Sequence, residues 1–427
     1  MNNSIRINKE YFGYVVGYPS GDIVIAKDTA GQLLLEGAGR NTLAEKGMLL
    51  ESFEVAADFY LKTPPLVWVE LTRRCNLSCP HCYIDGGEAR KDELPSEWFF
   101  SLLDDLAEMG VWAVAFTGGE PTLHPEFSRL VNYARELGML VGVATNGMFL
   151  TEELLSSLRK DGVILSVSLD NLHVMGKSKS AEFRMVTRAI VRAHQSGFRT
   201  NIMTNINRQN LQELDDLFGW AKANGVSIRS VPFSPLGRGK VNKKELELTG
   251  LEAFNAADFW VRECEWEHEY HKEVGLCVGA IFNYGLSLAY MTNRCSSGRF
   301  LAYVCADGVV YPCTMCAGEK ILSPGSVRHK KFSLLWNDVW EIRSFNWERF
   351  EDTCKGCPIH HEDYYCAARC PATSHARHKT YFGCGASEFE MVSTVVRTSK
   401  LKQTESGRSS GIPIVDITSN YPTGDEP

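Results

Sequence analysis

The sequence predicts an α/β fold in which a partial (β/α)6 barrel, TIM-like in its order of elements, precedes a smaller cysteine-rich domain. From residue 66 onwards, short β-rich apolar runs alternate with stretches of helical period. Beyond about residue 290 this alternation stops, and nine of the fourteen cysteines fall between positions 295 and 384. The first observation predicts the barrel, and the second predicts the cysteine-rich domain.

Each apolar run has the length and composition of a strand buried in a parallel sheet. The predicted strands are 66–71, 111–116, 140–145, 163–169, 199–205 and 226–233. The predicted helices are 96–109, 125–137, 151–160, 183–196, 210–224 and 248–262. Repeated strand–helix order implies parallel strands joined by right-handed crossovers. The carboxyl ends of such strands share one edge of the sheet, and we expect the chemistry at that edge.

Polar or glycine-rich segments follow all six predicted strands. In chain order they are "TRRCNLSCPHC", "TGGEPT", "NG", "DN", "NINRQN" and "SPLGRG". The predicted organisation around them is a small N-terminal segment (1–62), the barrel (63–245), a helical linker (246–290), the cysteine-rich domain (291–386) and an unstructured tail (387–427). Within the N-terminal segment we expect a hairpin around residues 19–22 and a helix over 42–61.

Composition narrows the class of protein. The 427 residues are 44% hydrophobic and 23% charged, which is typical of a globular enzyme, and the net charge of −7 leaves no basic footprint for nucleic acid. No apolar run is long enough for a membrane span or a signal peptide, so we expect a cytoplasmic protein with no membrane partner. Because the cytoplasm keeps thiols reduced, fourteen cysteines indicate metal binding or catalysis in preference to disulfides.

The segment "ELTRRCNLSCPHCYIDGG" places three cysteines, Cys75, Cys79 and Cys82, just after the first predicted strand. Four ligands would complete a tetrahedral zinc site or a four-iron cluster. A zinc site using His81 as the fourth ligand requires the adjacent residues 81 and 82 to converge on one ion, which is strained. A four-iron cluster held by three thiolates instead leaves one iron open to bind substrate.

This Cys-x3-Cys-x2-Cys spacing, with His81 before the third cysteine and "GGEP" at Gly118–Pro121, resembles the signature of the radical S-adenosylmethionine (SAM) enzymes. The resemblance implies that the three cysteines are the catalytic ligands of a [4Fe-4S] cluster with an open site. It implies that SAM chelates the open iron through its amino and carboxylate groups. Reductive cleavage of SAM then yields a 5'-deoxyadenosyl radical, which abstracts hydrogen from unactivated C–H bonds.

The resemblance also predicts residues that contact SAM. Gly118 and Gly119 let the backbone approach the methionine moiety, and Gly118 and Glu120 can meet its ammonium group. His81 and Tyr83 are placed to flank the adenine. The candidates at later strand ends, near the ribose and the carboxylate, are Asn146, Ser168, Asp170 and Asn205.

The later cysteines lie in "CSSGRFLAYVCADGVVYPC", which includes a predicted hairpin turn at "ADG", and in "CKGCPIHHEDYYCAARC". They resemble the SPASM extension of radical SAM enzymes, which carries two auxiliary [4Fe-4S] clusters. The resemblance assigns one cluster to Cys354, Cys357, Cys366 and Cys384, and the other to Cys295, Cys313 and Cys370. Cys316 is the first choice for the missing ligand; Cys305, Cys277 or an open iron are the alternatives. Structural zinc sites are a further alternative for such CxxC pairs.

The predicted fold class, once the SPASM resemblance is included, is a partial (β/α)6 TIM-like barrel followed by a C-terminal cysteine-rich iron-sulfur domain. The resemblance implies oxidative modification of a ribosomally made peptide, by a thioether or carbon–carbon crosslink. Sulfatase maturases carry an aspartate after the cysteine aligned with Cys313, whereas this chain has Thr314, which disfavours that activity. Arg238 and residues 360–363 are candidates for lining a substrate channel.

The expected partners are a peptide substrate, an external reductant of the flavodoxin or ferredoxin type, and a separate leader-binding protein. The last is expected because residues 1–62 are short for a complete peptide-binding winged-helix module. Alternatives are a radical SAM enzyme acting on a small molecule such as a tetrapyrrole, a sulfatase-maturase-like enzyme, and a non-catalytic iron-sulfur or zinc-binding protein.

Overall fold

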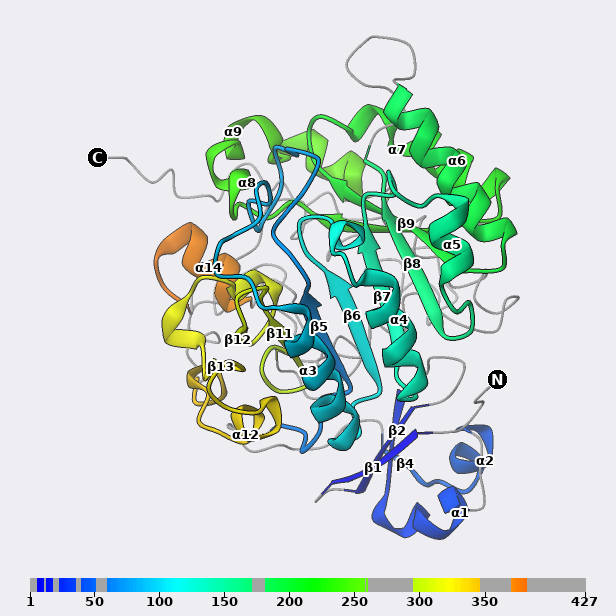
Figure 1. Ribbon diagram of the computed structural model, residues 1–427, viewed down its shortest axis with the longest axis vertical. Helices are drawn as coiled ribbons and strands as arrows, with labels where there is room; N and C mark the ends of the chain where they lie inside the picture. Colours follow the sequence, from blue (N-terminus) through cyan, green and yellow to red (C-terminus); the bar gives the residue numbers. More distant parts are fainter. Residues whose placement is uncertain are drawn as a thin grey trace, which may run out of the picture.

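The computed structural model contains one large sheet, one small sheet and the helices that cover them (Figure 1). It describes residues 6–10, 13–17, 23–35, 40–50, 60–170, 181–257, 259, 295–345 and 370–381. Within these residues the large sheet has the strand order β10-β9-β8-β7-β6-β5-β11-β12-β13, and the small sheet has the order β1-β2-β3-β4.

Six parallel strands form the predicted barrel sheet. They are β5 (Leu66–Glu70), β6 (Ala113–Thr117), β7 (Leu140–Thr145), β8 (Val163–Ser168), β9 (Arg199–Ile206) and β10 (Ser227–Pro232). Each strand pairs in parallel with the next along the chain, so all six predicted strands are confirmed. Their runs of Val, Ile, Leu and Ala are almost fully buried, as expected for a parallel sheet covered by helices.

The crossover helices follow the predicted order. They are α3 (Ser96–Glu108), α4 (Phe127–Glu136), α5 (Glu152–Ser157), α6 (Ala181–Gln195) and α7 (Leu214–Ala223), and residues 250–257 are also helical. Two short helices that we did not predict, α8 (Arg238–Val241) and α9 (Lys243–Leu246), follow β10. Figure 1 shows α3 and α4 lying over the strands near β5 to β7. Because the six strands run parallel, the loops that follow their carboxyl ends lie at one edge of the sheet.

The cysteine-rich region extends the barrel sheet. Strand β11 (Leu301–Val304) pairs in parallel with β5, and β12 (Val309–Tyr311) and β13 (Gly325–Ser326) continue the sheet in antiparallel order. The predicted hairpin at "ADG" is confirmed, and Gly308 adopts the left-handed φ of +84° that the turn requires. The two predicted domains therefore share one nine-stranded sheet.

A single hydrophobic core also joins the two regions. It runs from Val67 and Phe116 in the barrel to Tyr303, Trp336 and Trp340 in the cysteine-rich region. The indole nitrogen of Trp336, in α12 (Phe332–Trp336), donates to the carbonyl of Leu61 at 2.8 Å. The chain that enters the barrel is thus held by the cysteine-rich region. α14 (Pro371–His378) completes the described part of that region.

The N-terminal residues form a separate antiparallel sheet with its own small core. Strands β1 (Arg6–Glu10), β2 (Gly13–Gly17), β3 (Ile23–Ala26) and β4 (Leu49–Leu50) pair in sequence, and α1 (Gly31–Leu35) and α2 (Arg40–Glu45) lie between β3 and β4. The pairing of β2 with β3 confirms the hairpin. The predicted helix over 42–61 is wrong as far as residue 50, because α2 ends at Glu45 and the next apolar pair joins the sheet as β4; residues 51–59 lie outside the described residues.

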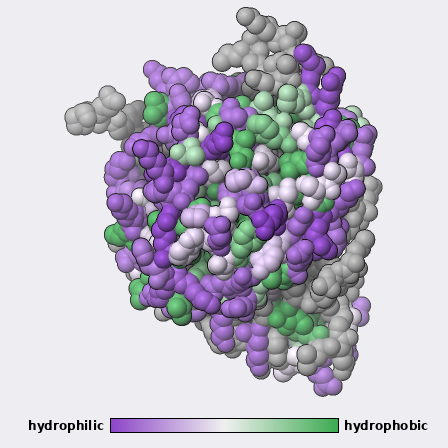
Figure 2. Space-filling model, in the orientation of Figure 1, coloured by the Kyte–Doolittle hydropathy of each residue, from purple (hydrophilic) through white to green (hydrophobic). Residues whose placement is uncertain are grey.

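None of the helices in the described ranges is long and apolar enough to cross a membrane. On the face shown in Figure 2, the surface is mainly hydrophilic, and the hydrophobic areas are small and separated.

Candidate iron-sulfur and SAM site

The loop that leaves β5 brings Cys75, Cys79 and Cys82 together. The backbone N–H of Leu77 donates to the sulfur of Cys75, and that of Gly86 donates to the sulfur of Cys82, each at 3.4 Å. Burial, together with the charges of Asp170, Cys82 and Cys75, raises the pKa of Cys79 to about 12. The three thiols thus lie close enough for their charges to interact, and a cationic centre bound between them would favour their thiolate forms.

The glycine pair of "TGGEPT" packs directly against this cysteine loop. The N–H of Gly119 donates to the carbonyl of Thr72, and the N–H of Glu120 donates to the carbonyl of Arg74, both at 2.8 Å. A Cβ atom on Gly119 would lie 2.4 Å from the Arg74 oxygen, and one on Gly118 would lie 2.3 Å from the Thr72 oxygen. Both positions therefore need glycine so that the two loops can approach each other.

Glu120 is fully buried and supports the neighbouring strand ends. Its carboxylate accepts hydrogen bonds from the hydroxyls of Thr122 (2.6 Å) and Thr145 (2.7 Å) and from the backbone N–H of Asn146 (2.7 Å). Burial raises the pKa of Glu120, while these donors lower it. The side chain is thus engaged within the protein, where it ties the second strand end to the third.

The later candidates connect the strand ends with the cysteine loop. The side-chain amide of Asn146 donates to Asn76 at 2.8 Å. Asp170 lies 3.2 Å from the Nε2 of His81 and also accepts a hydrogen bond from the backbone N–H of Asn205 at 2.7 Å. Ser168 ends β8 with an exposed side chain. All four candidates therefore lie at the same edge of the sheet.

Tyr83 lies between the two regions of the chain. Its hydroxyl lies close enough to the side chains of Thr117, at the end of β6, and Thr314, directly after Cys313, for both to lower its pKa. Burial raises the pKa of this phenol, which stays protonated at neutral pH. Tyr83 thus links the first cysteine loop with the second group of cysteines.

Arg238 clamps the cysteine loop, a role that the sequence did not reveal. Its backbone N–H donates to the carbonyl of Cys82, and its Nε donates to the carbonyl of Cys79, both at 2.9 Å. A terminal guanidinium nitrogen also reaches Asp85 and the carbonyl of Gly86, at 2.7 Å each. The only sequence signal was its position in the polar segment after the sixth strand.

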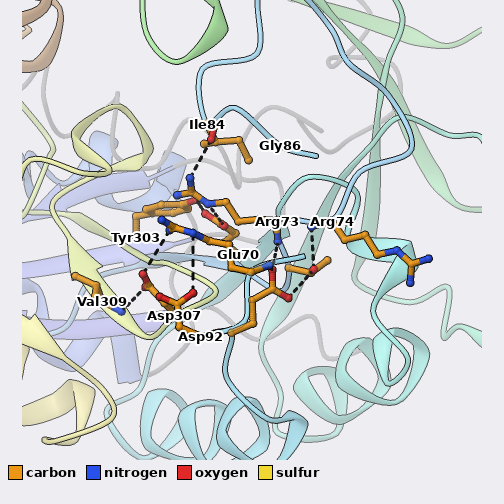
Figure 3. Close-up of polar contacts among 12 residues, drawn as sticks. Glu70, Arg73, Arg74, Ile84, Gly86, Asp92, Tyr303, Asp307 and Val309 are labelled. Carbon is orange, nitrogen blue, oxygen red and sulfur yellow. Dashed lines mark hydrogen bonds and ion pairs between the residues drawn. The ribbon is translucent and has the colours of Figure 1, made fainter. Parts of the chain in front are cut away.

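A buried polar network ties the cysteine loop to the sheet of the cysteine-rich region (Figure 3). Glu70, at the end of β5 and fully buried, accepts hydrogen bonds from the hydroxyl of Tyr303 and from the Nε of Arg73. Arg73 also donates to the carbonyl of Ile84 at 2.9 Å, within the same loop. Burial raises the pKa of Glu70. The sequence did not reveal this network, because Glu70 and Tyr303 are 233 positions apart.

A second group of thiols forms from Cys295, Cys313, Cys316 and Cys370. The sulfurs of Cys313 and Cys316 lie 3.5 Å apart, and the thiol of Cys295 donates to the hydroxyl of Ser297 at 3.2 Å. Burial raises the pKa of Cys370 to about 12, with further contributions from the charges of Cys295 and Cys313. A hydrogen bond from Cys316 lowers the pKa of Cys313 to about 7.

Cys305 lies apart from this group. Its pKa is raised by burial and then by the charge of Glu70, and its side chain hydrogen-bonds with Arg73. Of the predicted alternatives for the fourth ligand, the structure thus brings Cys316 to the group and places Cys305 in the Glu70 network. Cys277, Cys354, Cys357, Cys366, Cys384 and residues 360–363 lie outside the described residues.

The surroundings of the cysteine sulfurs resemble those of iron-sulfur clusters in proteins. In the part of the chain that the structure describes, no three His, Cys, Asp or Glu side chains converge closely enough to hold one metal ion. A four-iron cluster is larger than an ion and takes thiolates from a wider space. Neighbouring thiols with backbone N–H groups directed at their sulfurs are the surroundings that such clusters have in proteins.

Comparison with known proteins gives the family. The profile of the radical SAM superfamily matches residues 69–221, and that of the SPASM iron-sulfur cluster-binding domain matches residues 295–358. The chain is 29% identical to the mycofactocin maturase MftC of Mycobacterium ulcerans, over 72% of this chain and 83% of the relative. It is 30% identical to the Fe-coproporphyrin III synthase of Methanosarcina barkeri, over 65% of this chain and 74% of the relative.

Among solved structures, the fold resembles that of Streptococcus suis SuiB bound to its precursor peptide SuiA. The TM-score is 0.65 with 16% sequence identity, covering 90% of this chain and 98% of SuiB.

The chain belongs to the radical SAM superfamily and carries a SPASM domain. It is accordingly an enzyme that binds SAM and iron-sulfur clusters, and the non-catalytic alternative falls away.

Proposed function

We propose that this enzyme oxidatively modifies a ribosomally made peptide, forming a thioether or a carbon–carbon crosslink. The observation that carries this proposal is the junction of the two thiol groups, where Tyr83 of the first loop lies close to Thr314, next to Cys313. A substrate radical formed at the first group would lie beside a second redox centre that can accept its electron. The relative MftC, named as a maturase, and the fold shared with peptide-bound SuiB support a peptide as the substrate.

The proposed ligands of the SAM cluster are Cys75, Cys79 and Cys82. When bound, this cluster and SAM supply a one-electron cleavage of the sulfonium and a carbon radical that removes hydrogen from the substrate. Arg238 and the glycine pair hold the cysteine loop in place. The proposed SAM contacts are Gly118, Gly119 and Glu120 for the methionine moiety, His81 and Tyr83 for the adenine, and Asn146, Ser168, Asp170 and Asn205 for the remaining polar groups.

We further propose two auxiliary four-iron clusters. The first would take Cys295, Cys313, Cys316 and Cys370, whose thiols lie together. The second would take Cys354, Cys357, Cys366 and Cys384. Thr314 stands where sulfatase maturases have an acidic residue, and a threonine hydroxyl is a poor base, so a sulfatase-maturase-like activity is not favoured.

An external reductant of the flavodoxin or ferredoxin type and a separate leader-binding protein complete the proposed system. The N-terminal sheet can share in leader recognition, because β1 is the last strand of its described sheet order. An extended peptide can add to such an edge through main-chain hydrogen bonds. Localisation in the cytoplasm is part of the same proposal, since the clusters and the reductant belong to a reducing compartment.

The experiment uses the full chain with its clusters reconstituted under anaerobic conditions. SAM and dithionite should yield 5'-deoxyadenosine, and a short peptide encoded beside this gene should lose hydrogen, as measured by mass spectrometry. The Cys75→Ala, Cys79→Ala, Cys82→Ala triple variant should keep the auxiliary clusters and lose SAM cleavage. Cleavage of SAM by the triple variant would refute the assignment of the primary site.

A small-molecule substrate is the second candidate, because a relative at 30% identity is named Fe-coproporphyrin III synthase. The same reaction mixture with coproporphyrin in place of the peptide distinguishes the small-molecule substrate from the peptide substrate. Conversion of the porphyrin without conversion of any peptide would favour this candidate.

A further inference from the structure

An open groove lies between the β7–α5 loop and helix α6. Its volume is about 380 Å³, and its lining includes Met148 and Leu150 from the loop and Met185 from the helix. Met185 is 47% exposed, whereas Leu150 is buried. Figure 1 shows α5 and α6 beside each other at this part of the barrel. The groove is distinct from both groups of thiols.

Three arginines from one face of α6 line this groove: Arg184, Arg188 and Arg192. They follow one another at intervals of four residues, which places their side chains on the same side of the helix. Arg192 lies 3.4 Å from Glu152 and donates to the carbonyl of Leu150 at 3.4 Å. Arg188 makes no hydrogen bond or ion pair with any described residue. Neighbouring like charges repel along a helix, and an anionic ligand would relieve this repulsion.

The spacing of the arginines matches that of carboxylates on an extended peptide. Four residues of α-helix rise by about 6 Å. Alternate residues of an extended chain point to the same side and lie about 6.6 Å apart. Acidic side chains at every second position of an extended segment can therefore face successive arginines. Apolar side chains between them can contact the methionines, whose flexible side chains adapt to different partners.

The groove also adjoins the candidate SAM site. Met148, in its wall, accepts a hydrogen bond from the side-chain amide of Asn76 at 3.0 Å, and Asn76 follows Cys75 in the cysteine loop. Asn146 bonds with both, donating to Asn76 at 2.8 Å and accepting from the Met148 N–H at 3.0 Å. A peptide bound in the groove would thus contact Met148, which itself contacts the cysteine loop.

We propose that this groove binds an acidic, extended segment of the peptide substrate, a proposal that rests on the peptide-modifying function above. Nucleic acid fits the groove less well, because the described lining contains no aromatic ring for base stacking and the whole chain carries a net charge of −7. The described lining includes no acidic side chain, and Glu152 pairs with Arg192 from beside the groove. Through Met148, binding there would orient the peptide relative to the cysteine loop.

The test measures the fluorescence anisotropy of a short fluorescein-labelled peptide of alternating glutamate and leucine with the reconstituted full-length enzyme. Binding should weaken as sodium chloride is added, and a glutamine–leucine peptide should bind poorly. The Arg184→Glu, Arg188→Glu double variant should bind the acidic peptide at least about tenfold more weakly. The matched control is Arg159→Glu, which changes an arginine that is also exposed but lies outside the groove.

A peptide of opposite charge distinguishes a folded double variant with altered specificity from a misfolded one. A lysine–leucine peptide should bind the double variant more tightly than it binds the wild-type enzyme. The proposal is overturned if the double variant keeps wild-type affinity for the acidic peptide, if the glutamine–leucine peptide binds equally well, or if polyuridylate binds the groove more tightly than the peptide.

The binding assay contains no dithionite, so its result does not depend on radical chemistry. Formation of 5'-deoxyadenosine and modification of the peptide are measured in parallel. Peptide modification without dependence on Arg184 and Arg188 would refute the groove alone. Binding of the acidic peptide by an enzyme that modifies only porphyrin would refute the proposed function alone.

Discussion

At the scale of residues, the cysteines that the structure describes in the SPASM region divide into two environments. Cys316 lies with Cys295, Cys313 and Cys370, and its pKa is raised by its hydrogen bond with Cys313, by burial and by the charges of these three cysteines. Cys305 is equally buried but lies beside Glu70 and Arg73. Burial alone therefore does not distinguish a cluster ligand from a core cysteine; the surrounding groups do.

This difference predicts the outcome of two alanine substitutions. Cys316→Ala should remove one cluster, about four iron atoms per chain, since a ligand is lost from a closed site. Cys305→Ala should keep the full iron content and serves as the control. Iron and acid-labile sulfide are measured after anaerobic reconstitution. Equal iron loss in both variants, or loss only in Cys305→Ala, would contradict the assignment.

The acidity of Cys313 predicts its reactivity in protein stripped of iron. A thiol with a pKa of about 7 gains thiolate as the pH rises, so its alkylation by iodoacetamide should be half-maximal near pH 7 and level off about one unit above it. Cys79, whose pKa burial raises to about 12, should react slowly throughout this range. Mass spectrometry of tryptic peptides follows both residues. Faster labelling of Cys79 than of Cys313 at neutral pH would refute the prediction, and reconstituted clusters should protect both.

At the scale of elements, the cysteine loop is held by its neighbours on both sides. The "TGGEPT" loop donates two backbone hydrogen bonds to it, and the segment after β10 clamps it through Arg238. Gly237, with a φ of +51°, would place a Cβ atom 2.5 Å from the carbonyl oxygen of Cys82. Close backbone packing therefore pre-forms the geometry of the three thiols before any cluster binds.

Replacement of Gly119 tests this packing. Gly119→Ala should force the two loops apart, because the new methyl group meets the Arg74 carbonyl at 2.4 Å, and should cost about 1–3 kcal/mol of unfolding free energy. The variant should also bind less iron. Gly219→Ala is the control: it lies in α7 with no atom within 4 Å of the added methyl, and should stabilise by about 0.5–1 kcal/mol. Chemical denaturation measures both values; an unchanged Gly119→Ala protein would argue against the tight approach.

At the scale of the whole molecule, the radical SAM and SPASM regions share one sheet and one core. β11 pairs with β5, the first strand of the barrel, and Tyr303 on β11 donates to Glu70 on β5. Arg343 of the SPASM region also lies over the ring of Tyr60, at the entry to the barrel. The two groups of thiols are thus connected through a continuously packed sheet and core.

This shared core predicts the behaviour of a truncated chain. A chain ending at residue 294 should lack a cooperative thermal transition and should aggregate, because it exposes the edge of β5 and the apolar surface that Trp336 and Tyr303 cover. Circular dichroism and size-exclusion chromatography compare it with the full chain. A monomeric truncated protein that melts like the full chain would show that the two regions fold independently.

The six strands and the first cysteine loop could be predicted from the sequence because their signals are local. Strands that are buried on both faces show continuous apolar runs, and Cys75, Cys79 and Cys82 are held near one another by the short chain between them. Cys316 was already the first choice from the sequence, but the separation of Cys305 from the group, the pairing of Glu70 with Tyr303 and the clamp of Arg238 depended on the tertiary structure. So did the strand at Leu49–Leu50, where we had predicted a helix. In each of these cases the deciding contact joins residues far apart in the chain, and only the folded packing determines which of them meet.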